Sequence, residues 1–81
     1  MLNFSVSEEN YIKAIFRLQH GDNTVTTNEL SAELRAKPAS ITDMMKKLRT
    51  KKLVHYEAYK GFRLTAEGRK AGLMIIRRHR L

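Results

Sequence analysis

The chain of 81 residues has no cysteine, no tryptophan and a single proline. Without cysteine it can form neither a disulfide framework nor a thiolate metal site, which is typical of proteins in a reducing compartment. The longest apolar run, residues 73–76, is far too short to cross a bilayer. Met1 is not followed by a basic segment and an apolar secretory core. We therefore expect a cytoplasmic protein that does not enter a membrane.

The sequence also lacks the residue groups on which catalysis depends. Its three histidines, His20, His55 and His79, are far apart in the sequence. There is no Gly-rich phosphate loop, no nucleophile next to a base and no sign of a carboxylate pair in a cleft. A chain of this length builds a modest core with no cavity large enough to enclose a substrate. We expect no enzymatic activity.

The charge is concentrated in one part of the chain. Residues 1–34 hold two Lys or Arg against five acids, a net charge of −3, whereas residues 35–81 hold fourteen against three, a net charge of +11. A concentrated positive field attracts polyanions by counterion release, and nucleic acid is the commonest such partner. An anionic membrane or an acidic protein is the rival partner, and basic residues can also serve solubility alone.

The first expected element is a helix. Glu8 and Glu9 follow Ser7 and place negative charge where a helix N-terminus favours it. We expect the helix to end near His20, with Gly21 as its stop. The apolar residues that repeat at helical spacing are Tyr11, Ala14, Ile15 and Leu18.

Residues 26–48 show two helix signals separated by a short turn. Thr26 to Leu30 resembles a capping box, in which a Thr hydroxyl and Glu29 satisfy each other's backbone N–H groups. The turn at residues 35–37 has no glycine, so one residue there is expected to adopt a strained left-handed backbone. The second helix opens with Pro38, which suits a first helical turn. Its expected inward stripe is Ile41, Met44, Met45 and Leu48.

Two β-prone runs follow, at residues 53–57 and 62–65, and a Gly-containing turn at residues 58–61 separates them. A hairpin directly after such a helix pair is a wing. Thr65 can cap a last helix with Glu67 in its first turn. We expect its inward stripe to be Ala71, Met74, Ile75 and Arg78. The order of elements predicts a mostly α fold with a small β-hairpin, a winged helix-turn-helix, as one domain over residues 1–81.

In a helix-turn-helix the second helix lies in the major groove of DNA with its N-terminal residues at the base edges. Side chains there include hydroxyls, a methyl that can pack on thymine and a carboxylate that can accept from cytosine. Lysines further along, a Thr hydroxyl at the preceding helix and the wing tip suit phosphates or the minor groove. The expected DNA-contacting residues are Thr27, Lys37, Ala39, Ser40, Thr42, Asp43, Lys46, Lys47, Tyr59 and Lys60. Tyr56 and Phe62 are expected to pack under the wing.

Four motifs in order resemble the N-terminal DNA-binding domain of the diphtheria toxin repressor and manganese transport regulator family. The motifs are Ser-Glu-Glu-Asn-Tyr-Ile-Lys-Ala-Ile (7–15), Pro-Ala-Ser-Ile-Thr-Asp-Met (38–44), Tyr-Lys-Gly-Phe-Arg-Leu-Thr-Ala-Glu-Gly-Arg (59–69) and Arg-Arg-His-Arg-Leu (77–81). The resemblance implies a bacterial transcriptional repressor that binds palindromic double-stranded operators as a homodimer, with Fe(II) or Mn(II) as corepressor. It also implies that dimerisation helices and about half of the metal ligands would follow residue 81.

Within the chain, the resemblance assigns one metal ligand to His79, whose alternative role is an exposed basic helix end. The corresponding first-helix positions hold Asn10, with only a weak carbonyl oxygen, and Lys13, which cannot ligate while protonated. Asn10 can instead hydrogen-bond at the helix start. The alternatives are therefore a winged helix that binds DNA without metal control, one that senses another signal, and one that binds a protein partner.

Overall fold

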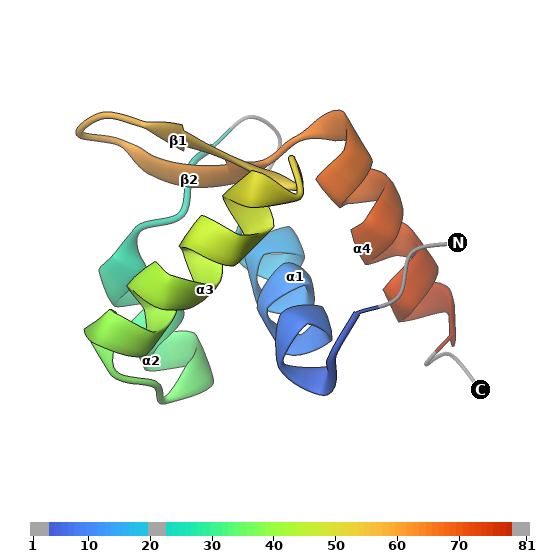
Figure 1. Ribbon diagram of the computed structural model, residues 1–81, viewed down its shortest axis with the longest axis horizontal. Helices are drawn as coiled ribbons and strands as arrows, with labels where there is room; N and C mark the ends of the chain where they lie inside the picture. The colour runs from blue at the N-terminus through green and yellow to red at the C-terminus, as the bar shows by residue number, and fades with distance from the viewer. Residues whose placement is uncertain (1–3, 20–22, 79–81) are drawn as a thin grey trace.

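The computed structural model describes residues 4–19 and 23–78 (Figure 1). The elements follow the order expected from the sequence: α1 (Val6–Leu18), α2 (Thr27–Leu34), α3 (Pro38–Thr50), β1 (Val54–Glu57), β2 (Gly61–Leu64) and α4 (Ala66–Arg78). In Figure 1, α4 lies on one side of α1, α2 and α3 lie on the other, and the hairpin spans one end of the helices. This is the mostly α architecture with a two-stranded wing that the sequence predicted.

Helix α1 begins earlier than predicted. Ser5 is its N-cap: the Ser5 hydroxyl accepts from the Glu8 N–H at 3.1 Å, and the Glu8 carboxylate accepts from the Ser5 N–H at 2.9 Å. Two reciprocal bonds favour this start, whereas Ser7 is exposed within the first turn. The helix ends at Leu18, and the predicted end near residue 20 and the stop at residue 21 lie outside the described residues.

The boundaries of α2 and α3 agree with the sequence. Thr26 caps α2 and forms the predicted capping box with Glu29. Arg35, with φ of 53°, adopts the left-handed backbone expected in a turn without glycine. Pro38 is the first residue of α3. This turn sets α3 against α2.

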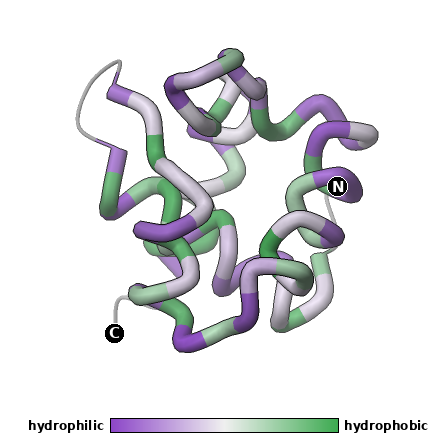
Figure 2. Tube along the Cα trace, turned by 90° about the vertical axis from the view of Figure 1, so that its left-hand side faces the viewer, coloured by the Kyte–Doolittle hydropathy of each residue, from purple (hydrophilic) through white to green (hydrophobic). Residues whose placement is uncertain are grey.

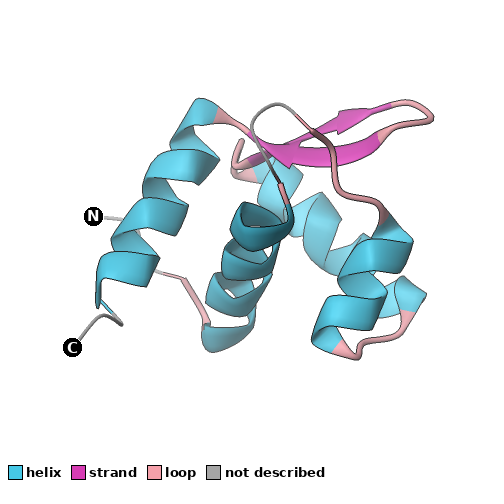
Figure 3. Ribbon diagram, turned by 180° about the vertical axis from the view of Figure 1, so that it is seen from behind, coloured by secondary structure: helices cyan, strands magenta, loops and turns pink. Residues whose placement is uncertain are grey.

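The hairpin gains a third backbone segment that the sequence did not reveal. β1 and β2 pair antiparallel, and Val25, which precedes the cap of α2, forms an isolated bridge with Phe62. The Val25 N–H donates to the Phe62 carbonyl at 2.6 Å and the Phe62 N–H donates back at 2.8 Å. Seen from behind, the segment before α2 runs beside the hairpin (Figure 3). Gly61 allows this approach, because its φ is 122° and a Cβ there would lie 2.5 Å from the Val25 carbonyl oxygen.

The predicted inward stripe of α4 was half wrong. Ala71 and Ile75 are buried, but Met74 is 42% exposed and the exposed Arg78 pairs with Glu9. The stripe instead includes Gly68 and Gly72, and a Cβ on Gly72 would lie 2.7 Å from the Phe16 ring. Periodicity of apolar side chains does not reveal these positions, because here the absence of a side chain lets α4 approach its neighbours.

One core joins all of the elements. Hydrophobic and hydrophilic segments alternate along the helices (Figure 2), and the hydrophobic ones supply the buried residues. Burying each large apolar side chain contributes about 1.5–3 kcal/mol. The largest fully buried side chains are Ile12, Ile15, Val25, Leu30, Ile41, Met45, Leu48 and Ile75. Over the described parts of the chain, no helix has the length and apolar character needed to traverse a membrane.

Candidate nucleic-acid interface

Helix α3 has one buried side and one exposed side. Ile41, Met45 and Leu48 are buried and Met44 is partly buried, as the predicted stripe required. The other residues of α3 are exposed. Each residue of α3 and its N-cap that the sequence assigned to DNA is exposed: Lys37, Ala39, Ser40, Thr42, Asp43, Lys46 and Lys47. Their contacts with DNA remain a prediction.

The two lysines of α3 lie on different flanks of the helix. Lys46 lines a hollow between α3 and the wing together with Thr42 and Tyr56. Lys47 lines a second hollow on the side of α1, together with Glu8 and other residues. The structure therefore brings Lys46, but not Lys47, next to the wing.

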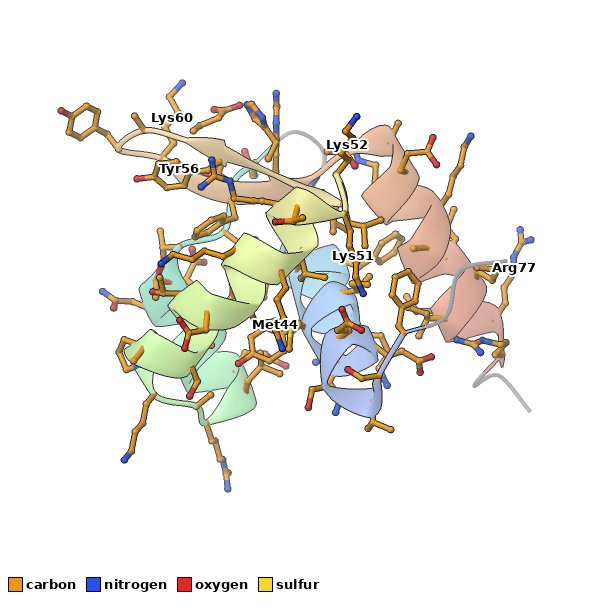
Figure 4. All side chains as sticks on the ribbon, in the orientation of Figure 1. Met44, Lys51, Lys52, Tyr56, Lys60 and Arg77 are labelled. Carbon is orange, nitrogen blue, oxygen red and sulfur yellow. The ribbon has the colours of Figure 1, made fainter. Side chains whose placement is uncertain are left out.

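The wing tip projects from the molecule. Tyr59 is fully exposed with a left-handed φ of 67°, and Lys60 points outward from the hairpin (Figure 4). The Thr24 hydroxyl donates to the Lys60 carbonyl at 2.8 Å, which ties the tip to the segment before α2. Thr27, the first residue of α2, is half-buried and lines the hollow beside the wing. The structure thus brings Thr27, Thr42 and Lys46 together beside the wing, whereas Lys47 lies on the flank beside α1.

Sequence reasoning missed Arg49 and expected Tyr56 to pack beneath the wing. Tyr56 does contact the buried Phe62, with ring centroids 5.0 Å apart, but it is 45% exposed. The Arg49 guanidinium lies 5.8 Å from the centre of the Tyr56 ring. Helical spacing could have identified Arg49, since it is three residues after Lys46 and seven after Thr42 on the same flank.

An ion pair fixes the C-terminal end of α3 against α1. The Lys51 ammonium donates to the Glu8 carboxylate at 2.5 Å, and the Lys51 side chain runs toward α1 (Figure 4). Glu8 is buried, at 8% exposure. The Lys51 contact, followed by the Ser5 N–H, lowers the pKa of the Glu8 carboxyl below its ordinary value. The acids of the first turn of α1 therefore do more than favour the helix N-terminus, because Glu8 also positions α3.

The described residues do not fit a metal centre by themselves. Asn10 is exposed and lies beyond the Ser5 cap, so it does not cap the helix start, and it offers only a neutral amide oxygen. The half-buried Lys13, one turn later, offers an ammonium that cannot ligate while protonated. Within residues 4–19 and 23–78, no three His, Asp or Glu side chains gather as metal ligands would. The predicted ligand His79 lies outside the described residues.

A helix pair joined by a tight turn and followed by a hairpin defines the class of winged helix-turn-helix proteins. The chain belongs to the iron dependent repressor family, whose N-terminal DNA binding domain matches residues 3–62. The resemblance found in the four sequence motifs is thereby confirmed.

Curated relatives are named as transcriptional regulators. The HTH-type transcriptional regulator MntR of Oceanobacillus iheyensis is 35% identical over 75 residues, which are 93% of this chain and 51% of that protein. MntR of Bacillus subtilis is 33% identical, over 93% of this chain and 53% of its own length. The chain therefore spans about half the length of these relatives.

Solved structures share the fold. ScaR with bound Zn²⁺ is 33% identical with a TM-score of 0.77, over 90% of this chain and 34% of that one. MOSR of M. tuberculosis, solved in complex with DNA, is 26% identical with a TM-score of 0.77, over 95% of this chain and 59% of that one. MepR of Staphylococcus aureus, at 16% identity and a TM-score of 0.77 over 93% of this chain and 57% of its own, shows the fold alone.

Proposed function

We propose that this chain reads double-stranded DNA as the N-terminal part of a metal-responsive transcriptional repressor. The observation that carries the proposal is the exposed side of α3, where Lys46 and polar side chains lie beside the wing that carries Lys60. The residues in contact with DNA would be the ten that the sequence indicated. Those near the start of α3 would meet base edges, whereas Lys46, Lys47 and Lys60 would meet phosphates.

A module that binds a protein partner is the main alternative, and the surface chemistry of α3 argues against it. A partner-binding helix is expected to expose an apolar patch. Among the described residues, the large apolar side chains that are exposed lie in α1, the hairpin and α4, and none lies in α3. The exposed residues of α3 that carry charge are instead mostly cationic.

The proposal extends to the whole regulator. By its family it would bind a palindromic operator as a homodimer and respond to Fe(II) or Mn(II), with His79 as one ligand. Asn10 and Lys13 would not complete such a site, so the other ligands would have to come from different residues. The same two residues favour a second candidate function, a winged helix that binds DNA without metal control.

A fluorescence anisotropy titration tests these proposals. The chain is titrated against a duplex from upstream of its own gene and a shuffled duplex, from low to moderate salt. Log K is expected to fall linearly with log salt at a slope of about −0.9 per neutralised phosphate. Salt-independent binding, or no binding, would contradict the DNA-reading proposal.

The metal question has its own comparison in the same assay. Titrations of the whole regulator, which would carry the remaining ligands, with Mn(II), with Fe(II) under anaerobic conditions and with a chelator are compared at fixed salt. Tighter binding with either metal supports metal control. Equal affinity in all three conditions supports the metal-independent candidate, and Mg(II) at the same concentration controls for a general effect of divalent ions.

A further inference from the structure

An arginine is held on an aromatic ring between α3 and the wing. The Arg49 guanidinium lies over the Tyr56 ring, which contacts the Phe62 ring in turn. Phe62 is only 9% exposed, and its backbone N–H and carbonyl both bond to Val25. This chain of contacts limits the positions that Arg49 can adopt, and an Arg over an aromatic face gains about 0.5–1 kcal/mol at an exposed site.

The ring and the arginine border an open hollow of about 270 Å³, lined by cationic and hydroxyl side chains over an apolar floor that includes Met45 and Phe62. The described residues that line it include no acid. Neither Arg49 nor Lys46 forms an ion pair with any residue in the described ranges. The lining residues are Thr27, Thr42, Met45, Lys46, Arg49, Tyr56 and Phe62. Such a lining suits an anion that can accept several hydrogen bonds.

The expected path of a DNA strand between α3 and the wing indicates that this anion is a backbone phosphate. In duplex DNA, a sugar-phosphate backbone separates each major groove from the neighbouring minor groove. If α3 occupies a major groove and the wing tip reaches the adjacent minor groove, that backbone has to pass between them. The hollow would then face that backbone, because its lining comes from α3 on one side and mainly from the hairpin on the other.

We infer that the hollow is a binding site for a DNA phosphodiester, with Arg49 as its main ligand and Tyr56 as the support of Arg49. The inference rests on the proposed function and deepens it. The planar guanidinium of Arg49 can donate two parallel hydrogen bonds to phosphate oxygens. Lys46 adds a second charge from the same flank of α3. The site fixes the register of the duplex and reads no base.

The test compares Arg49→Ala with Arg77→Ala in duplex titrations over a range of salt. Both variants lose one exposed positive charge, and Arg77 lies on α4, far from the hollow (Figure 4). Arg49→Ala is expected to weaken binding to all duplexes by about tenfold and to reduce the salt slope by about 1. Arg77→Ala is expected to leave the slope close to that of the wild type. Circular dichroism checks that both variants fold.

Variants of the ring test its supporting role. Tyr56→Phe keeps the ring and is expected to bind like the wild type, whereas Tyr56→Leu is expected to weaken binding several-fold. In the Arg49→Ala background, Tyr56→Leu is expected to add little further loss, because the two residues act as one unit. Arg49→Lys keeps the charge but loses the planar fork, so its affinity should fall between those of the wild type and Arg49→Ala.

The outcomes separate this inference from the proposed function. If the wild type binds duplexes with a steep salt dependence but Arg49→Ala matches Arg77→Ala, the phosphate site is wrong and DNA reading stands. If Arg49→Ala relaxes the preference at one base position, Arg49 reads a base and the assignment to phosphate is overturned. Equal losses for Tyr56→Phe and Tyr56→Leu would refute the role of the ring. If the wild type binds no duplex, the proposed function fails, and the phosphate site fails with it.

Discussion

Arg35 holds a backbone conformation that L-residues rarely adopt. Arg35 follows the last residue of α2 and has a φ of 53°, a position where glycine is the usual residue. Neighbouring hydrogen bonds hold the turn: the Ala36 N–H donates to the Ser31 carbonyl at 3.2 Å, and the Ser31 hydroxyl donates to the Ala36 carbonyl at 2.6 Å. A left-handed L-residue costs about 1–2 kcal/mol, so the connection between α2 and α3 stores strain at one residue.

We expect Arg35→Gly to raise the free energy of unfolding by about 0.5–1 kcal/mol, because glycine adopts this φ without a Cβ clash. Chemical denaturation at neutral pH measures the change. Lys70→Gly is the control: Lys70 is exposed within α4, where glycine costs about 1 kcal/mol. A loss of stability in Arg35→Gly would show that the turn relies on the arginine side chain.

At the scale of elements, α3 presents different chemistry on its two flanks. The flank beside the wing carries Lys46 and Arg49, and the flank beside α1 carries Lys47 near the ion pair of Glu8 and Lys51. The Glu8 carboxylate lowers the net charge of the second flank. We expect the N-terminal end of α3 to contact base edges and the wing to contact the DNA backbone.

This division predicts different effects of Ser40→Ala in α3 and Lys60→Ala in the wing. Ser40→Ala should relax the preference at one base position, because it removes a group that hydrogen-bonds base edges. Lys60→Ala should weaken all duplexes about equally and reduce the salt slope by about 1. Titrations against a set of single-base operator variants measure both effects. A uniform loss for Ser40→Ala would mean that the helix does not lie in the groove as proposed.

At the scale of the molecule, α1 is tied to each of the other helices by an ion pair. Glu8 pairs with Lys51 just after α3, Arg17 with Glu33 of α2 at 2.6 Å, and Glu9 with Arg78 of α4 at 2.7 Å. Exposed pairs contribute about 0–1 kcal/mol. The pair of Glu8 with Lys51 differs from the other two, because the Glu8 side chain is only 10% exposed. Protonation of Glu8 therefore bears on the stability of the whole fold.

The lowered pKa of Glu8 gives a signed prediction for stability against pH. A carboxyl with a lower pKa in the folded state stabilises the protein above its ordinary pKa of 4.5. This contribution is lost as the pH falls through the folded-state pKa. We expect the free energy of unfolding of Glu8→Gln to be about 1 kcal/mol lower than that of the wild type at pH 7. The difference should shrink below about pH 4.

Urea denaturation between pH 3 and pH 8 measures the difference between wild type and variant. Asp43→Asn is the control, since Asp43 is exposed, lies beyond the first turn of α3 and forms no ion pair with any residue in the described ranges. Its stability difference should be near zero at every pH. A Glu8→Gln difference that does not change with pH would show that the charge of Glu8 adds nothing to the folded state.

Local sequence signals determined much of the architecture. The Thr26 capping box and the position of Pro38 depend on neighbours within a few residues, and both were predicted correctly. The hairpin was also predicted, but β2 begins at Gly61, which was expected in the turn, and ends at Leu64. The buried stripe of α3 followed from helical periodicity in the same way. The family was also evident from the sequence, because its four motifs occur in order along the chain, and the family's domain matches residues 3–62.

Contacts between distant residues were decided by the tertiary structure alone. The Val25 bridge and the pair of Glu8 with Lys51 join residues 37 and 43 positions apart, so no local pattern predicts them. Gly72 is buried because Phe16 lies against it. Met74 is exposed because no element among the described residues covers it. The contact between Arg49 and Tyr56 depends on the packing of the wing against α3. The sequence by itself determined which helices and strands form, whereas packing decided which side chains meet between them.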